Sequence, residues 1–337
     1  MLRDFYFLRT DVKLSLLKTL QPVLGYIREF YLKEFRFSYF MLILLLTGTL
    51  IYLNYRYQLE SEYVAAGQTK LSKFAGYYLL YFIPFTLAFL VQPFFLKNCS
   101  YYKNHWFWII LLLAPAFFSF RVNFDLHQPL IKALWNGDEQ EFWVQSLNWV
   151  VRVFVVLIPV FIIWWIKDKN NQPFYGSKAI KKIKPYLIML LIMIPIITFA
   201  STQKDFLQMY PKAKFLAQLE LVSKEKYYLF YELCYGFDFI SIEFFFRGFL
   251  ILSLLKICGP HCIIPVACFY CTIHFGKPLG EAISSFWGGM LLGIISYNTQ
   301  SVWGGLIVHL GIACGPWISR AQARSGHTVH PAAGKAR

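Results

Sequence analysis

The amino-acid sequence predicts an all-α protein, a polytopic bundle of about eight to ten transmembrane helices. Of the 337 residues, 57% are hydrophobic and only 15% are charged, whereas soluble domains carry about 25% charged residues. The apolar residues also gather into stretches near the roughly 20 residues that a helix needs to cross the hydrocarbon core of a bilayer. Both observations indicate an integral membrane protein.

The chain divides into five regions. Residues 1–36 are amphipathic and mixed in charge, which favours a cytoplasmic or interfacial leader. The regions that follow are the N-terminal transmembrane helices (37–201), a surface amphipathic segment (202–225), a transmembrane core that holds the candidate site (226–318) and a disordered basic tail (319–337). Nine spans are expected by length, at 38–56, 74–96, 105–121, 147–166, 185–201, 226–257, 261–276, 280–297 and 301–318.

The basic residues of the loops indicate the orientation. The leader holds seven Lys and Arg residues, six lysines follow the fourth span, and the loop between the third and fourth spans is acidic. Because Lys and Arg concentrate in cytoplasmic loops, we expect a cytoplasmic N-terminus in an inner or plasma membrane. Four lysines in segment 202–225 fit this orientation poorly. The net charge of +15 suits anionic lipid headgroups, so membrane lipid is an expected partner and nucleic acid is not.

Seven cysteines lie mostly in apolar segments, and Cys268 and Cys271 have the CxxC spacing. A zinc or redox site is one interpretation of this spacing, but no second CxxC follows at the distance typical of zinc fingers. Cysteine also packs as a small apolar residue. We favour the packing role.

Four titratable residues in apolar stretches form the candidate catalytic set: Glu243, Arg247, His274 and His309. Glu243 and Arg247 are four residues apart and therefore share a helical face. Charged groups at membrane depth are costly and are functional candidates by default, although a structural ion pair is the alternative for these two. His274 ends an apolar run, and His309 lies in the middle of one.

These residue types can hydrolyse a peptide bond. A carboxylate and a histidine activate water directly or through a metal, a second histidine donates to the oxyanion or completes a metal site, and an arginine orients the carboxylate. Glu243, His274 and His309 are therefore also the candidate ligands for a divalent metal such as zinc. A metal-free mechanism is the other possibility.

The order and spacing of these residues resemble the CPBP family of intramembrane proteases, also called Abi, which includes CAAX prenyl proteases and bacteriocin-processing enzymes. The family pattern is EExxxR, then FxxxH, then HxxxN on three helices. Here the segments read Ile242-Glu243-Phe-Phe-Phe-Arg247, Tyr270-Cys-Thr-Ile-His274 and His309-Leu-Gly-Ile-Ala313, and the resemblance covers roughly 225–318.

The resemblance implies a role for each candidate and a class of substrate. Glu243 and His274 would activate water, Arg247 would orient Glu243, and His309 would stabilise the oxyanion or bind a metal. The substrate would be a protein or peptide that enters from the membrane. The expected function is therefore that of an intramembrane endopeptidase, with a metalloprotease and a metal-free mechanism both open.

Three positions depart from the family pattern, since Ile242, Tyr270 and Ala313 stand where the family has Glu, Phe and Asn. Asp238 lies one helical turn before Ile242 and is a candidate for the missing carboxylate. The departures favour the alternative function, a non-catalytic membrane protein used for binding, immunity or scaffolding. A transporter ranks third, because no Pro- or Gly-broken helices occur in matching halves.

Overall fold

The computed structural model describes residues 2–97 and 99–313, with side chains for residues 18–97 and 99–312. Within these residues the chain is helical, and its β-structure is limited to an isolated bridge between Ser177 and Ser301. The α-helices are α1 (Leu2–Lys33), α2 (Phe37–Tyr57), α3 (Lys70–Leu90), α4 (His105–Asn123), α5 (Gln128–Leu134), α6 (Gly137–Ile163), α7 (Lys184–Ala200), α8 (Lys204–Met209), α9 (Lys224–Glu243), α10 (Ser253–Cys258), α11 (Ile263–Thr272), α12 (Leu279–Thr299) and α13 (Trp303–Ala313). Short π-helical segments lie at Leu59–Ala65, Trp164–Asp168 and Phe244–Leu252, and 3₁₀ turns lie at Gln92–Phe94, Ser100–Lys103, Lys212–Ala217 and Gly259–Cys262.

The described residues contain six helical segments that are long and apolar enough to cross a membrane, namely Phe37–Tyr57, Lys70–Phe94, His105–Leu134, Gly137–Asp168, Lys224–Thr272 and Leu279–Thr299. The all-α prediction is confirmed, but the count of eight to ten spans is not. Two predicted spans, 226–257 and 261–276, fall in the single 49-residue segment Lys224–Thr272. Two others correspond to shorter apolar helices, Lys184–Ala200 and Trp303–Ile312.

Many large apolar side chains lie on the outer surface of the bundle. Leu45, Phe161 and Leu191 lie on three different helices and are 67%, 47% and 62% exposed. Such an apolar exterior is unfavourable in water and matches a hydrocarbon solvent. Together with the membrane-length helices, this surface indicates an integral membrane protein.

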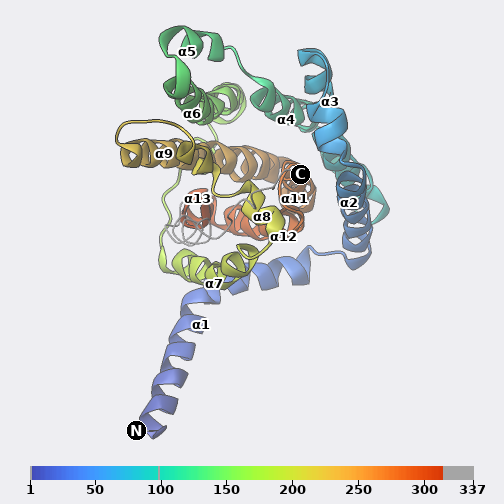
Figure 1. Cartoon of the computed structure of the whole chain (residues 1–337). Helices are drawn as coiled ribbons and strands as arrows, with labels where there is room; N and C mark the ends of the chain where they lie inside the picture. The colour runs from blue at the N-terminus through green and yellow to red at the C-terminus, as the bar shows by residue number, and fades with distance from the viewer. Residues whose placement is uncertain (1, 98, 314–337) are drawn as a thin grey trace.

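Helix α11 lies at the centre of the bundle, packed against α3 and α12 (Figure 1). Each of its residues is buried, because every side of the helix faces another helix. Phe245 and Phe246, from the π-helical segment after α9, meet the ring of Phe269 edge-to-face at centroid distances of 6.0 and 5.2 Å. This aromatic core holds α9 and α11 in register and so positions the polar residues at its edge.

Part of the leader extends away from the helical bundle, whereas part of the segment after α7 is buried against it. Most of the leader is α1, whose N-terminal part extends away from the bundle (Figure 1). Segment 202–225 is only partly a surface segment, since Ala213 and Leu216 are buried against a cluster that includes Phe142 of α6 and Tyr231 of α9. The predicted tail, 319–337, lies outside the described residues.

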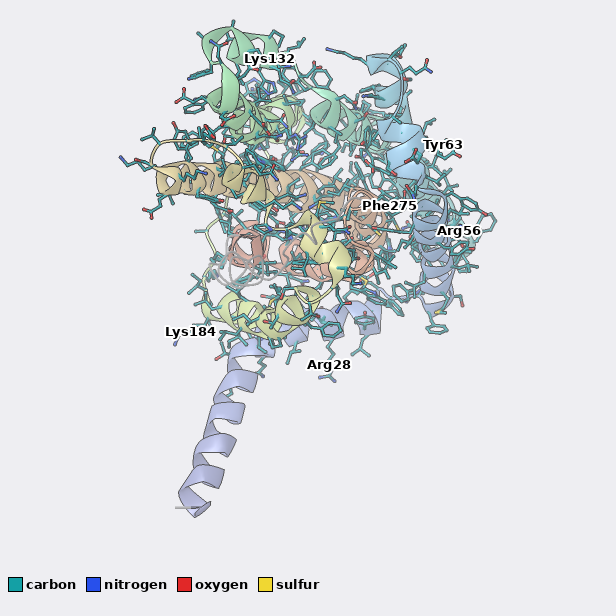
Figure 2. All side chains as sticks on the ribbon, viewed as in Figure 1. Arg28, Arg56, Tyr63, Lys132, Lys184 and Phe275 are labelled. Atoms are coloured by element: carbon teal, nitrogen blue, oxygen red, sulfur yellow. The ribbon has the colours of Figure 1, made fainter. Side chains whose placement is uncertain are left out.

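Exposed basic residues lie at both edges of the bundle. Arg28 of α1 and Lys184 at the start of α7 lie at one edge, and Lys132 of α5 lies at the opposite edge (Figure 2). All three side chains are exposed. The part of the leader near Arg28 and the end of the lysine-rich loop at Lys184 therefore share an edge of the bundle.

Candidate active site

Glu243 and Arg247 form the predicted pair at the point where α9 becomes π-helical. Glu243 is the last residue of α9, and Arg247 lies in the segment Phe244–Leu252. Their side chains are 0% and 1% exposed, with Arg247 Nη1 3.5 Å from Glu243 Oε1. Among the described residues no acceptor forms a hydrogen bond with the guanidinium, which lies over the ring of Tyr270 with Cζ 4.1 Å from the centroid. Arg247 is thus held by charge and by a cation–π contact.

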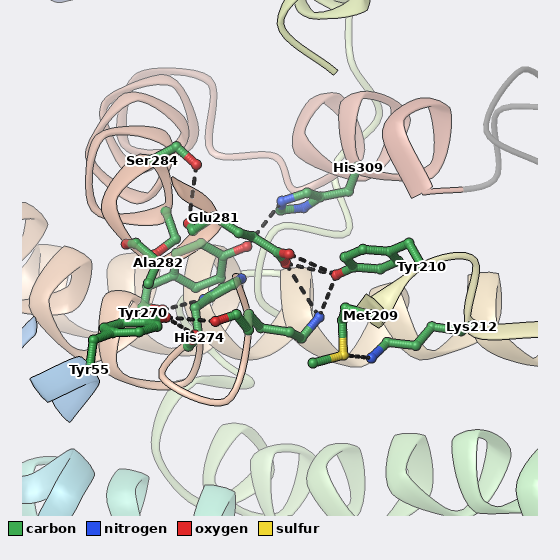
Figure 3. A network of polar contacts seen from close by, with 12 residues as sticks. Tyr55, Met209, Tyr210, Lys212, Tyr270, His274, Glu281, Ala282, Ser284 and His309 are labelled. Carbon is green, nitrogen blue, oxygen red and sulfur yellow. Dashed lines mark hydrogen bonds and ion pairs between the residues drawn. The ribbon is translucent and has the colours of Figure 1, made fainter. Parts of the chain in front are cut away.

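His309 joins Glu243 to Tyr270. Its Nδ1 lies 2.6 Å from Glu243 Oε1, and its Nε2 lies 3.0 Å from the Tyr270 hydroxyl. Because an ionised carboxylate only accepts hydrogen bonds, His309 Nδ1 carries a proton and donates a hydrogen bond to Glu243. The three side chains form a continuous relay from a buried carboxylate to a hydroxyl, of which Figure 3 shows the Tyr270–His309 link.

The approach of α13 to α9 depends on small residues. The Glu243 Oε2 atom lies so close to Gly305 that a Cβ there would overlap it, and a Cβ at Gly304 would overlap the ring of Tyr186. The start of α13 is fixed by the loop after α6, since Val302 N donates to Gly176 O at 3.0 Å and Trp303 Nε1 donates to Ser177 O at 2.9 Å.

His274 lies in the turn between α11 and α12. Its Nδ1 donates to the backbone oxygen of Tyr270 at 2.7 Å, because a carbonyl oxygen cannot donate. This bond fixes the tautomer that leaves a lone pair on Nε2. Burial lowers the pKa of His274 to about 4, so the ring is neutral at pH 7. Tyr55 Oη, which donates to Lys277 O at 2.7 Å, holds the turn in place.

A second polar cluster lies beside His274 and is absent from the predicted set. The Tyr210 hydroxyl donates to the carboxylate of Glu281, 2.9 and 2.8 Å from its two oxygens, and Lys277 Nζ lies 2.8 Å from that hydroxyl and 3.3 Å from Glu281 Oε1 (Figure 3). Burial and the Glu281 carboxylate raise the pKa of Tyr210. In the sequence, Lys277 and Glu281 interrupt the apolar runs shortly after His274, and this interruption could have pointed to both residues. Tyr210 has no such signal, since it comes from segment 202–225.

Asp238 does not take the place of the missing carboxylate. Its two carboxylate oxygens lie 2.6 and 2.5 Å from Arg121 Nη2, and both side chains are buried. Asp238 is therefore already paired with a cation from α4. Ile242, at the vacant position, is 9% exposed and belongs to the aromatic core.

The candidate metal ligands do not fit a metal centre. Both ring nitrogens of His309 are bonded to protein groups, and the part of the chain that the structure describes has no group of three His, Cys, Asp or Glu residues placed to hold an ion. Cys268 and Cys271 are buried free thiols. Their sulfurs lie 3.6 Å from Thr47 Oγ1 and 3.2 Å from the backbone oxygen of Ala282.

Comparison with known protein families gives a match to part of the chain. Residues 227–314 match the family model described as type II CAAX prenyl endopeptidase Rce1-like, and this range includes all four predicted site residues. No curated protein and no solved structure matches the chain. The segment 227–314, which carries the buried Glu243–Arg247 pair and both histidines, therefore matches a CAAX protease family, as the order and spacing of its motifs predict.

Proposed function

We propose that the protein is an intramembrane endopeptidase that hydrolyses a peptide bond of a protein or peptide entering from the membrane. The observation that carries this proposal is the relay of Glu243, His309 and Tyr270 beside a neutral His274, inside the segment that matches a CAAX endopeptidase family. A buried, mutually oriented set of acid, base and hydroxyl is an arrangement that peptide hydrolysis needs.

His274 is the residue best placed to accept the proton of the attacking water. Its Nδ1 is committed to the Tyr270 carbonyl, so Nε2 offers the lone pair. Because burial keeps the ring neutral, that lone pair is available at pH 7. The proton taken from water can then be returned to the leaving amine.

Glu243 acts through His309 rather than on water. One carboxylate oxygen accepts from His309 and faces Arg247, and the other lies against Gly305. Glu243 therefore orients the His309 imidazole and fixes its tautomer, while the Arg247 guanidinium offsets the charge of the carboxylate. This role differs from the direct activation of water that the family resemblance implies.

The membrane orientation follows from the basic loops. We place the N-terminus on the cytoplasmic side of an inner or plasma membrane, since the leader and the loop after α6 are both rich in Lys and Arg and share an edge of the bundle (Figure 2). The steps above use only protein groups. Addition of zinc and addition of a chelator test whether a metal takes part.

The test is cleavage of a peptide library by the purified protein in detergent or nanodiscs. We expect cleavage by the parent and its loss in Glu243→Ala and in His274→Ala, with both variants still folded. Glu225→Ala is the matched control, because Glu225 is an exposed carboxylate on the same helix α9, and it should retain the parental rate. Full activity of either site variant contradicts the assignment.

A second candidate function is a non-catalytic CPBP-like protein that binds peptides without cleaving them. It is favoured by Ile242 and Ala313, which replace two polar residues of the family pattern. The same library distinguishes the two functions, since a non-catalytic protein retains bound peptides at full length, with or without added zinc.

A further inference from the structure

We propose that Asn54, with its neighbour Tyr55, is a positioning residue for His274 and holds the turn that carries this base from a helix outside the matched segment. This inference rests on the proposed endopeptidase function. It begins from the contrast between the two ends of His274. Its ring is bonded to α11, but its backbone lies in a turn beyond the end of that helix.

The turn after α11 is bonded to the C-terminal end of α2. Asn54 Nδ2 donates to Phe275 O at 3.1 Å, and Tyr55 Oη donates to Lys277 O at 2.7 Å. The Tyr55 hydroxyl also lies 3.4 Å from His274 O (Figure 3). Three backbone oxygens of one turn therefore meet two adjacent side chains of α2.

Both ends of the Asn54 amide are committed to protein groups. Its Oδ1 accepts from Glu60 N at 3.0 Å, so the other end is the NH₂ group that donates to Phe275 O. Asn54 is 3% exposed, and a buried polar group that loses its partner is costly. Asn54 thus joins α2, the π-helical segment Leu59–Ala65 and the turn at one point.

The same π-helical segment also closes in the turn at Gly276. A Cβ at Gly276 would lie 3.0 Å from Glu60 Oε2, and Glu60 Oε1 accepts from the Tyr77 hydroxyl of α3 at 2.5 Å. The carboxylate that lies against the turn is therefore itself held in place. The turn cannot move toward it without a steric overlap.

These contacts fix the direction of the His274 lone pair. The ring is held by Tyr270 O, which accepts from Nδ1 at 2.7 Å, and the backbone is held by α2. A misplacement of about 1 Å in a reacting group can cost on the order of 10²-fold in rate. Because Asn54 is buried and bonded twice to protein, it acts through the position of His274 and does not touch the substrate.

The experiment compares kcat and KM for peptide cleavage in Asn54→Leu and Tyr55→Phe. Leucine keeps most of the volume of asparagine and removes both hydrogen bonds. We expect Asn54→Leu to lower kcat by about 10²-fold and to leave KM unchanged. Tyr55→Phe removes a single hydroxyl and should lower kcat by about 3–10-fold, which is what one neutral hydrogen bond is typically worth.

Two control variants remove equivalent groups away from the turn. Asn123→Leu removes an amide that donates to Ser119 O at 2.8 Å at the end of α4. Tyr39→Phe removes a hydroxyl at the other end of α2, which donates to Ala88 O at 2.8 Å. Both controls should keep the parental kcat.

Hydrogen exchange, measured by mass spectrometry, tests the position of the turn without relying on cleavage. In Asn54→Leu the backbone amides of residues 273–278 should exchange faster than in the parent, and those of α13 should exchange as in the parent. Unchanged exchange in the turn overturns the positioning role. If Asn54→Leu does not fold, Tyr55→Phe decides by the same measurements.

The remaining outcomes separate this inference from the proposed function. A parental kcat in both variants, when the parent cleaves, overturns the positioning role and leaves the endopeptidase function intact. A loss of kcat with faster exchange in α13 as well as in the turn also overturns it, because the bundle as a whole has then loosened. Absence of cleavage by the parent overturns the endopeptidase function and this inference with it.

Discussion

The Glu243–Arg247 pair allows a quantitative test of whether the two charges depend on each other. In Arg247→Met the side chain keeps much of its volume and loses its charge, which leaves a carboxylate that is 0% exposed without its cation. Removing one partner of a buried pair typically costs about 3–5 kcal/mol. Protonation of the carboxylate limits that penalty, because neutralising a carboxyl of ordinary pKa near 4.3 costs about 3.7 kcal/mol at pH 7 and only about 1 kcal/mol at pH 5.

The expected result is a fall in melting temperature that depends on pH. At about 2 °C per kcal/mol, Arg247→Met should melt about 7 °C below the parent at pH 7 and about 2 °C below it at pH 5. Scanning calorimetry or fluorescence in detergent measures both values, and Glu243→Gln in the same chain should restore most of the loss at pH 7. Arg56→Met is the matched control, since Arg56 is exposed and also lies near an aromatic ring, that of Tyr57. A decrease of equal size at both pH values would refute the reasoning.

Three further predictions concern the surroundings of the pair. Gly305→Ala should displace the Glu243 carboxylate and abolish cleavage. Gly288→Ala, where a Cβ meets nothing within 4 Å, should keep the parental activity in the same assay. Parental activity of Gly305→Ala would mean that α13 has room to move. Because the pKa of His274 is lowered to about 4, kcat/KM should hold between pH 7 and pH 5 and fall only near pH 4, whereas an acid limb centred near pH 6.5 would show an ordinary histidine. The unfolded chain binds this proton more tightly between pH 4 and 6.5, so His274 should make stability rise with pH across that window. Asp238→Asn leaves the buried Arg121 without its ionised partner and should lower the melting temperature, while the folded variant keeps the parental kcat. A loss of kcat in a folded variant would show that Asp238 takes part in the reaction.

The sequence predicts which charged residues share a helical face, because this signal is local. A four-residue spacing places Glu243 and Arg247 on one helical face whatever the rest of the chain does, and the structure has them paired at 3.5 Å. The apolar runs likewise predict an all-α membrane bundle. Their number is harder to predict, since α7 is shorter than a typical span and two predicted spans form one long segment.

The partners of each polar group could not be predicted, because they come from distant parts of the chain. Asp238 lies on the face expected for a substitute carboxylate, yet it forms an ion pair with Arg121 of α4, which is more than 100 residues away in sequence. Tyr210 reaches Glu281 from a segment whose composition predicts only surface. Helical periodicity describes one helix at a time and carries no information about which helices meet.

The loop after α6 has a consequence for the autonomy of the family domain. Residues Gly176 and Ser177 hold the start of α13, and the backbone oxygen of Tyr175 lies against Gly248, one residue after Arg247. One short stretch of backbone thus sets the spacing between the helix that carries the acid and the helix that carries the last histidine, and it lies outside the matched range 227–314. The matched segment, if expressed alone, would lose the backbone contacts that this loop makes with α13 and with Gly248. The loop after α6 therefore sets the geometry of the candidate site from outside the matched segment, and transplanting the site to another scaffold requires carrying this loop with it.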